Sequence, residues 1–181
     1  RRVFLDDVEM NGGTKDNPES SVEHKIGHHP LFDSADEIFL SASWTNSTNS
    51  RVTAFILWLI SKKKKVTVIS TVNFNNVTSL SYVAAKRKLM GEQLEIFLFN
   101  NIREKYQAYY FSLKQRIESE TDKVVFLEKR NAFCKIDKKT CNLKNESGWL
   151  IYDNEHLSVE GAKHFGRYVT ENWLARQFFS Q

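Results

Sequence analysis

The sequence predicts an α/β domain with three layers, in which helices cover both faces of a mostly parallel sheet. Apolar runs of strand length alternate with longer segments of helical periodicity along the chain, and this alternation is typical of strand–helix–strand units. The chain has 181 residues, of which 41% are hydrophobic. That length suits one domain with a substantial core and is too short for two. We therefore expect residues 1–181 to form a single domain.

The expected strands are short apolar runs. They lie at residues 3–5, 37–44, 66–70, 123–127 and 149–152. The run at 37–44 has few polar residues, as expected for a strand that is buried on both faces. Residues 94–99 are ambiguous between a strand and a buried helix, because periodicity cannot separate the two in short apolar runs.

Four helices are expected between and after these strands. Residues 49–61 and 78–90 have helical periodicity, and Gly91 would end the second helix. The helix at 102–120 has an inward face made of Ile102, Tyr106, Tyr109, Leu113 and Ile117. The last helix begins after Ser158, a favourable N-cap, and is expected to bury Ala162, Phe165, Val169 and Trp173.

Charge and hydropathy limit the partners. The net charge is +4, and the basic excess lies mainly in residues 62–65 and 86–88. These runs lack interleaved exposed aromatics and any nucleic-acid-binding motif, so we expect solvated helix ends and no nucleic-acid partner. The longest apolar run, residues 54–60, is far shorter than the roughly twenty residues of a membrane span. It is expected to be a buried helix.

The chain has two cysteines, Cys134 and Cys141. They either form a local disulfide or remain as two unpaired thiols. The spacing is wrong for a Cys-x-x-Cys redox pair, and no second pair exists for structural zinc. A disulfide is the favoured interpretation. It would stabilise the fold by somewhat under about 3 kcal/mol and indicate an oxidising compartment.

The histidines outside the C-terminal loop do not predict a metal site. His24, His28 and His29 lie near Asp33 and Asp36, but their spacing would not bring three or four ligands together. His164, on the last helix, has no ligand-like spacing either. We expect no metal ion and no organic cofactor.

The clearest chemical signal is Asp153 with His156, in a loop that follows an apolar run and precedes a helix. Open α/β sheets place their sites in such loops. The spacing lets the carboxylate bind one ring nitrogen while the other nitrogen serves as a general base. On spacing alone, a turn aspartate followed by a surface histidine is the competing interpretation.

The stretch Asp153-x-x-His156-Leu157-Ser158-x-x-Gly161-Ala162 resembles the closing motif of the SGNH hydrolase superfamily. It is most similar to the SGNH domain at the C-terminus of acyltransferase-3 proteins, which O-acylate surface polysaccharides. The order of parts from about residue 35 to 170 also resembles this family, including a strand that ends at Trp44 and a cysteine pair before the motif. The resemblance implies that Asp153 and His156 are catalytic.

The nucleophile of this family is not found. SGNH enzymes carry Gly-Asp-Ser after their first strand, and the only comparable segment here, Asp6-Asp7-Val8, puts valine where serine belongs. Valine has no oxygen to deprotonate. Ser34 follows an aspartate, but it precedes a strand instead of ending one. Either the nucleophile lies upstream of Arg1 or outside this chain, or the domain has lost it.

The oxyanion donor is also altered. Many SGNH enzymes use the asparagine of Gly-x-Asn-Asp to stabilise the developing oxyanion. Here Asn46 is a candidate donor and Trp44 a candidate for lining a substrate pocket. A capping or turn role for Asn46 and a core role for Trp44 are equally open.

By this resemblance we expect acyl-ester chemistry on carbohydrate, either O-acyl transfer or deacetylation of an extracytoplasmic glycan, by an SGNH-type O-acyltransferase or esterase. The implied partners are a carbohydrate, an acyl donor and a membrane acyltransferase domain upstream. The implied location is extracytoplasmic, on the periplasmic face or secreted, with membrane tethering. The alternative is an inactive SGNH-like module that binds glycan or a partner.

Overall fold

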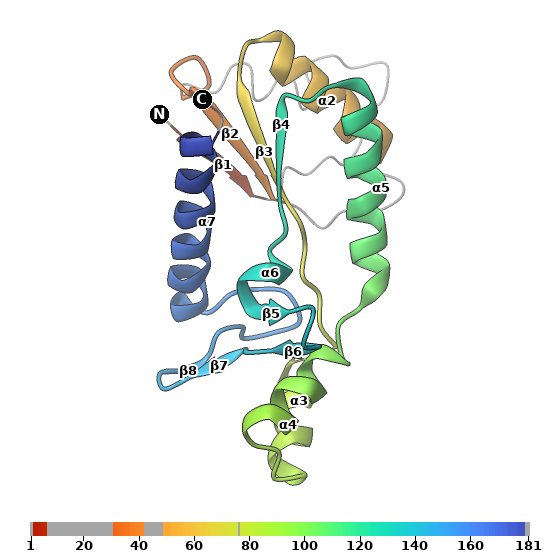
Figure 1. Ribbon diagram of the computed structural model, residues 1–181, viewed down its shortest axis with the longest axis vertical. Helices are drawn as coiled ribbons and strands as arrows, with labels where there is room; N and C mark the ends of the chain where they lie inside the picture. Colours follow the sequence, from red (N-terminus) through yellow and green to blue (C-terminus); the bar gives the residue numbers. More distant parts are fainter. Residues whose placement is uncertain (1, 7–30, 42–48, 76, 180–181) are drawn as a thin grey trace. The chain divides into compact units, whose positions relative to one another are not determined.

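The computed structural model describes residues 2–6, 31–41, 49–75 and 77–179 (Figure 1). Contacts divide the chain into two compact units. The first, called the sheet unit here, comprises Arg1–Thr71 and Lys105–Leu127, and the second, called the loop unit, comprises Val72–Glu104 and Glu128–Gln181. The expectation of a single domain stays a prediction.

The sheet unit is built on four parallel strands in the order β1-β2-β3-β4. The strands are β1 (Arg2–Asp6), β2 (Glu37–Ser41), β3 (Lys65–Ile69) and β4 (Val124–Leu127). The register places Ser41 opposite both Asp6 and Ile69, and Ile69 opposite Leu127, so the carboxyl ends of all four strands meet at one edge. The α/β class and the parallel sheet are thus confirmed. Residues 42–44 of the expected second strand lie outside the described residues.

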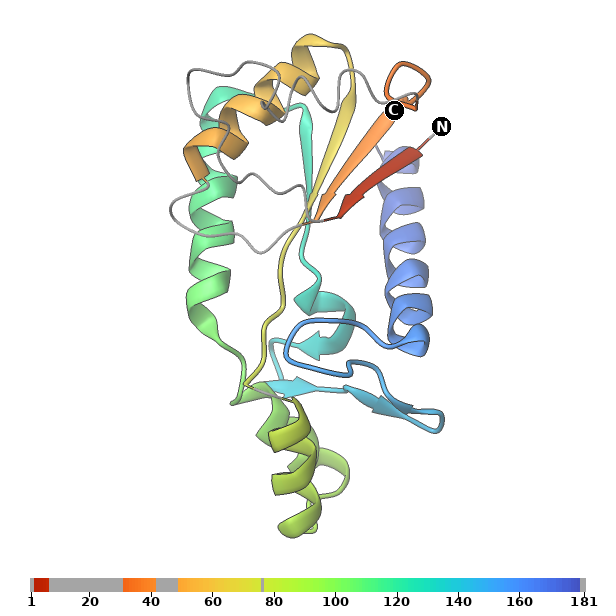
Figure 2. The same ribbon diagram turned by 180° about the vertical axis from the view of Figure 1, so that it is seen from behind.

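Helices α2 (Asn49–Ser61) and α5 (Glu104–Glu120) lie side by side over one face of this sheet (Figures 1 and 2). The core between them contains alternate residues of β2 and β3, which point to the same face. Its largest fully buried members are Ile38, Leu40, Phe55, Ile56, Leu59, Tyr110, Leu113 and Ile117. The boundaries of α2 are those predicted from its periodicity.

The inward face of α5 differs from the expected one. Gln107, Tyr110, Leu113 and Ile117 are buried, whereas Tyr109 is only half-buried. The difference arises because the Gln107 side-chain amide donates a 2.6 Å hydrogen bond to the Thr71 carbonyl. Gln107 is polar, so the spacing of hydrophobic residues does not reveal that it belongs to the buried face of the helix.

The lysine run at residues 62–65 is only partly a solvated helix end. The Lys64 ammonium donates hydrogen bonds of 2.8, 3.2 and 2.9 Å to the carbonyls of Phe32, Asp33 and Ala35. It also lies 4.8 Å from the centre of the Phe32 ring. Lys64 therefore fixes the turn that leads into β2, while Lys62, Lys63 and Lys65 are exposed.

The loop unit is made of short elements. They are α3 (Val77–Lys86), α4 (Gly91–Phe99), α6 (Arg130–Phe133), β5 (Cys134–Lys135), β6 (Thr140–Cys141), β7 (Lys144–Asn145), β8 (Gly148–Trp149) and α7 (Val159–Phe179). Their shared core includes Phe74, Leu80, Leu98, Phe133, Leu143, Leu150 and Ile151. The ambiguous segment 94–99 belongs to a helix.

The helix expected at 78–90 ends early, at Lys86. Lys88 adopts a left-handed backbone with φ of 54°, and Gly91 has φ of 53°. The chain therefore turns after Lys86, and Gly91 begins α4 instead of ending α3. Gly91 suits this position because glycine adopts positive φ without steric cost.

Cys134 and Cys141 form the favoured disulfide. They face each other in the β5–β6 hairpin, with Cα atoms 4.0 Å apart. Both are buried. This confirms the prediction and excludes the unpaired thiols.

The prediction of a strand at residues 149–152 is wrong. Trp149 pairs in the two-stranded β7–β8 hairpin, and Ile151 forms an isolated bridge with Leu157. The apolar run was a correct sign of burial, since Leu150 and Ile151 are each 3% exposed. They fill the loop-unit core and make no sheet strand, so Asp153 and His156 do not follow a strand of the parallel sheet.

The last helix starts as predicted but buries a different residue. The Ser158 hydroxyl accepts a hydrogen bond from the Gly161 N–H, at 3.1 Å, which is the expected N-cap. Ala162 is exposed, Phe165 and Val169 are half-buried, and Gly161 is buried. The Trp173 side chain lies outside the described residues. No described helix combines the length and apolar character needed to cross a membrane.

Candidate functional site

The loop between Leu150 and Ser158 is closed at its base by backbone hydrogen bonds. The Ser158 N–H donates to the Leu150 carbonyl at 2.9 Å, and the Tyr152 N–H donates to the His156 carbonyl at 3.1 Å. The Ile151–Leu157 bridge lies between these two bonds. The ends of the segment that carries Asp153 and His156 are thus fixed against each other.

Asp153 organises the tip of this loop through both carboxylate oxygens. Its Oδ1 accepts the backbone N–H groups of Glu155 at 2.8 Å and His156 at 2.7 Å. Its Oδ2 lies 2.5 Å from Nδ1 of the His156 ring. The same carboxylate therefore sets the backbone turn and orients the imidazole, as the three-residue spacing predicts.

These contacts determine the charge state of Asp153. Partial burial raises the pKa of its carboxyl, but the backbone N–H groups of Glu155 and His156 and the His156 ring outweigh this effect and hold the pKa below its ordinary value. A carboxylate that accepts several hydrogen bonds stays ionised at neutral pH. An ionised Asp153 accepts the Nδ1 proton, which leaves Nε2 as the acceptor in the neutral ring.

The outer side of the His156 ring is open. Its side chain is 57% exposed, and the Tyr152 ring stacks on it with centroids 5.7 Å apart and planes at 19°. Within the described parts of the chain, no residue forms a hydrogen bond with Nε2. The described residues therefore leave the nitrogen that a general base would use without a hydrogen-bond partner.

The segment after β3 supports the loop from outside. The Asn73 amide donates to the Glu155 carboxylate at 2.9 Å, and the Phe74 N–H donates to the Asn154 carbonyl at 2.7 Å. The Lys129 ammonium donates to the Glu155 carbonyl at 3.2 Å. Sequence reasoning missed these supports. The one available signal was Asn73, a polar residue that lies between the apolar Val72 and Phe74.

Gly161, the glycine of the motif, is required for a steric reason. A Cβ atom at Gly161 would lie 1.7 Å from the Leu150 carbonyl oxygen. Only glycine lets the first turn of α7 approach the start of the loop this closely. The Leu157 side chain packs against the loop-unit core, so Leu157, Ser158 and Gly161 together hold the loop against the helix.

Most of the other residues considered from the sequence lie outside the part of the chain that the structure describes. Trp44, Asn46 and Val8 lie outside the described residues, as do His24, His28 and His29. Ser34 lies in an exposed turn before β2, where its hydroxyl donates to the Leu31 carbonyl at 3.2 Å. Within the described ranges, no three His, Cys, Asp or Glu side chains are grouped to hold a metal ion.

Comparison with protein families decides the relationship. The family model described as "SGNH domain (fused to AT3 domains)" matches residues 16–171. The chain belongs to this family. The match confirms the resemblance that the motif from Asp153 to Ala162 predicts.

A solved structure supports the same fold. The periplasmic domain of a lipopolysaccharide acetyltransferase from Salmonella ser. Paratyphi A is similar to this chain, with a TM-score of 0.63 and 14% sequence identity. The similarity covers 89% of this chain and 66% of the Salmonella domain, just under two thirds of its length. No curated protein has a significantly matching sequence.

Proposed function

We propose that this SGNH domain performs acyl-ester chemistry on carbohydrate, as an O-acyltransferase or deacetylase of an extracytoplasmic glycan. The observation that carries the proposal is the Asp153–His156 pair, in which the carboxylate contacts Nδ1 and no described residue forms a hydrogen bond with Nε2. Family membership and the fold of a lipopolysaccharide acetyltransferase domain support the substrate class.

His156 is the proposed general base. It removes the proton of an attacking hydroxyl through Nε2 and returns that proton to the leaving oxygen, and the ionised Asp153 stabilises the imidazolium formed in between. Asn46 is the proposed oxyanion donor, and Trp44 is proposed to line the substrate pocket. The nucleophilic hydroxyl is not assigned to a residue.

The family context supports the setting. The family is fused to AT3 domains, so a membrane acyltransferase domain is the proposed partner that delivers the acyl group. The disulfide between Cys134 and Cys141 agrees with an oxidising, extracytoplasmic compartment. The proposed reaction requires no metal ion or organic cofactor.

The second candidate function is a catalytically inactive module that binds glycan or a partner. Val8 follows Asp6 and Asp7 in the sequence, and this favours the module because valine stands where the family's motif carries serine. The Asp153–His156 pair favours the enzyme, because a binding module has no chemical need for an oriented base.

Hydrolysis of aryl acetates by the protein and by its His156→Gln variant separates these functions. The enzyme should turn over the acetate with a kcat at least about a hundredfold above that of the variant, which is the typical contribution of a general base. Equal rates for the two proteins would contradict the proposed role of His156. No turnover by either would favour the binding module.

A further inference from the structure

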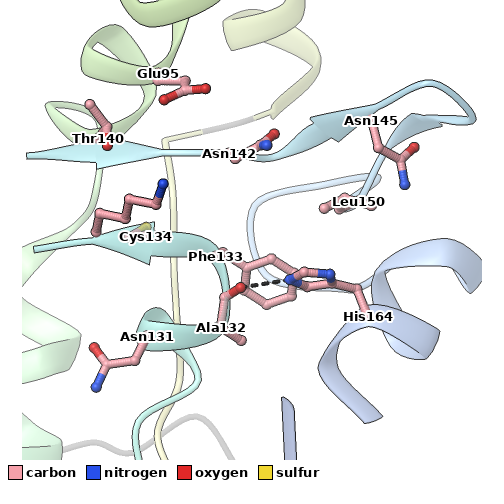
Figure 3. A pocket seen from close by; sticks show the side chains of 11 residues that line it. Glu95, Asn131, Ala132, Phe133, Cys134, Thr140, Asn142, Asn145, Leu150 and His164 are labelled. Carbon is pink, nitrogen blue, oxygen red and sulfur yellow. Dashed lines mark hydrogen bonds between the residues drawn. The ribbon is translucent and has the colours of Figure 1, made fainter. Parts of the chain in front are cut away.

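A concave feature of the loop unit lies beside the segment that leads to the Asp153–His156 loop. It is a cavity of about 290 Å³, bounded by α4, α6, the β5–β6 hairpin, β7, Leu150 and α7 (Figure 3). This volume is close to the lower end of the roughly 300–1,000 Å³ of small-molecule sites. All of its lining residues belong to one compact unit.

The buried floor of the cavity is apolar. Phe133, Leu150 and the disulfide-bonded Cys134 line it, and each is at most 6% exposed. The Leu150 carbonyl also accepts the Ser158 N–H at the base of the Asp153–His156 loop. One residue thus belongs both to the cavity wall and to the frame that holds Asp153 and His156.

The rim offers hydrogen-bonding groups that are not used within the described structure. Asn142 and Asn145 accept backbone N–H groups of Lys144 and Ser147 through their side-chain oxygens, which leaves each NH₂ as a donor. Glu95 supplies a carboxylate acceptor, and Lys135 supplies an ammonium donor. The rim therefore carries both donors and acceptors.

Two less exposed groups point to a polar ligand. The Thr140 side chain lines the cavity, and its hydroxyl can both donate and accept a hydrogen bond there. His164 Nε2 lies 2.7 Å from the Ala132 carbonyl, so it must carry the proton, and Nδ1 of the neutral ring remains as an acceptor.

We infer that this cavity binds a single sugar residue of the glycan. A saccharide presents hydroxyls that both donate and accept, together with small C–H faces, and this combination matches a mixed polar rim over an apolar floor. A fatty acyl chain does not fit a rim with Glu95, Lys135 and three asparagines. A phosphate does not fit beside the Glu95 carboxylate. The role of this site as a glycan subsite for acyl chemistry rests on the proposed function.

Side-chain amide NMR with methyl glycosides of glucose, galactose, mannose and rhamnose at millimolar concentration tests this inference. At least one glycoside should shift the NH₂ signals of Asn142 and Asn145. Thr140→Val and Asn145→Ala should each weaken its binding about tenfold, as expected for loss of one hydrogen bond. Lys138→Ala is the control, because Lys138 lies exposed in the same hairpin and is not among the lining residues. It should bind normally.

Absence of shifts with every glycoside would overturn the inference, as would shifts produced only by inorganic phosphate or by hexanoate. Equal binding by wild type and the Thr140 and Asn145 variants would also overturn it. The His156→Gln variant should bind the glycoside normally. Glycoside binding without aryl acetate turnover would therefore contradict the proposed enzyme but support the sugar site. Aryl acetate turnover without glycoside binding would support the enzyme but contradict the sugar site.

Discussion

At the scale of single residues, Asp153 links local structure to chemistry. One of its oxygens accepts two backbone N–H groups, and the other binds the His156 ring. The turn that presents the imidazole and the charge that fixes its tautomer therefore come from one side chain. An asparagine at this position keeps an oxygen for the backbone N–H groups but loses the charge, so the two roles can be tested separately.

Asp153→Asn should lower kcat for aryl acetates by about 10³–10⁴-fold, because an amide NH₂ facing Nδ1 favours the wrong imidazole tautomer. The amide oxygen can still accept the backbone N–H groups, so the variant should fold. Steady-state kinetics and circular dichroism check this together. Asp137→Asn removes an exposed carboxylate elsewhere in the loop unit and should leave kcat unchanged. A similar loss of rate in both variants would refute the assignment.

The lowered pKa of Asp153 also predicts a pH-dependent contribution to stability. A carboxyl whose folded-state pKa lies below its unfolded value of about 3.9 stabilises the fold above that pH. The contribution is lost as the pH falls through the folded pKa. In urea unfolding, the free energy of unfolding of wild type should therefore exceed that of Asp153→Asn by the largest amount near neutral pH. This difference should become smaller below about pH 4. A difference in the free energy of unfolding that does not vary with pH would contradict this explanation.

At the scale of elements, the junction between the loop and α7 depends on close backbone approach. The Leu150 carbonyl occupies the place of a Cβ at Gly161, whereas a Cβ at Gly166 on the same helix would meet no atom within 4 Å. The two glycines form a matched pair, since they share a helix but differ in what surrounds them.

Gly161→Ala should lower the free energy of unfolding by about 3 kcal/mol, because the backbone must move to admit the methyl group. Gly166→Ala should raise it by up to about 1 kcal/mol, since alanine has the higher helix propensity. Chemical denaturation measures both. Equal effects of the two substitutions would mean that the first turn of α7 does not contact Leu150 as described.

The helices and strands also show which parts of the fold can be predicted from the sequence. Long periodic segments such as α2 and short β-branched runs such as β3 were predictable, because their patterns follow local burial. The apolar run at 149–152 predicted burial correctly but not its partner, since the same pattern suits a sheet strand or a packed loop. Asp153 and His156 were predictable because their contact is local. Asn73 and Lys129 were not, because their bonds to the loop join residues far apart in sequence.

At the scale of the whole molecule, the chain passes between the two compact units three times, at residues 71–72, 104–105 and 127–128. The loop unit is therefore made of two separate chain segments, and so is the sheet unit. A unit assembled from separate segments must close loops through the other unit in order to fold. We expect the two units to unfold together, in accord with one domain.

Leu113→Ala in the sheet-unit core and Leu143→Ala in the loop-unit core should each lower the free energy of unfolding by about 2–5 kcal/mol. Both leucines are 0% exposed. Fluorescence of single-tryptophan proteins that keep Trp58, beside the first core, or Trp149, beside the second, should report one common transition for each variant. A shift confined to the tryptophan of the mutated unit would show two independent folding units.

The central claim is that the Asp153–His156 pair activates a hydroxyl. Labelling with a serine-directed fluorophosphonate, followed by peptide mapping, tests it most directly. The full chain should be labelled at one serine or threonine hydroxyl, and His156→Gln should not be labelled there. Equal labelling of the two proteins, or no labelling of either, would contradict the claim.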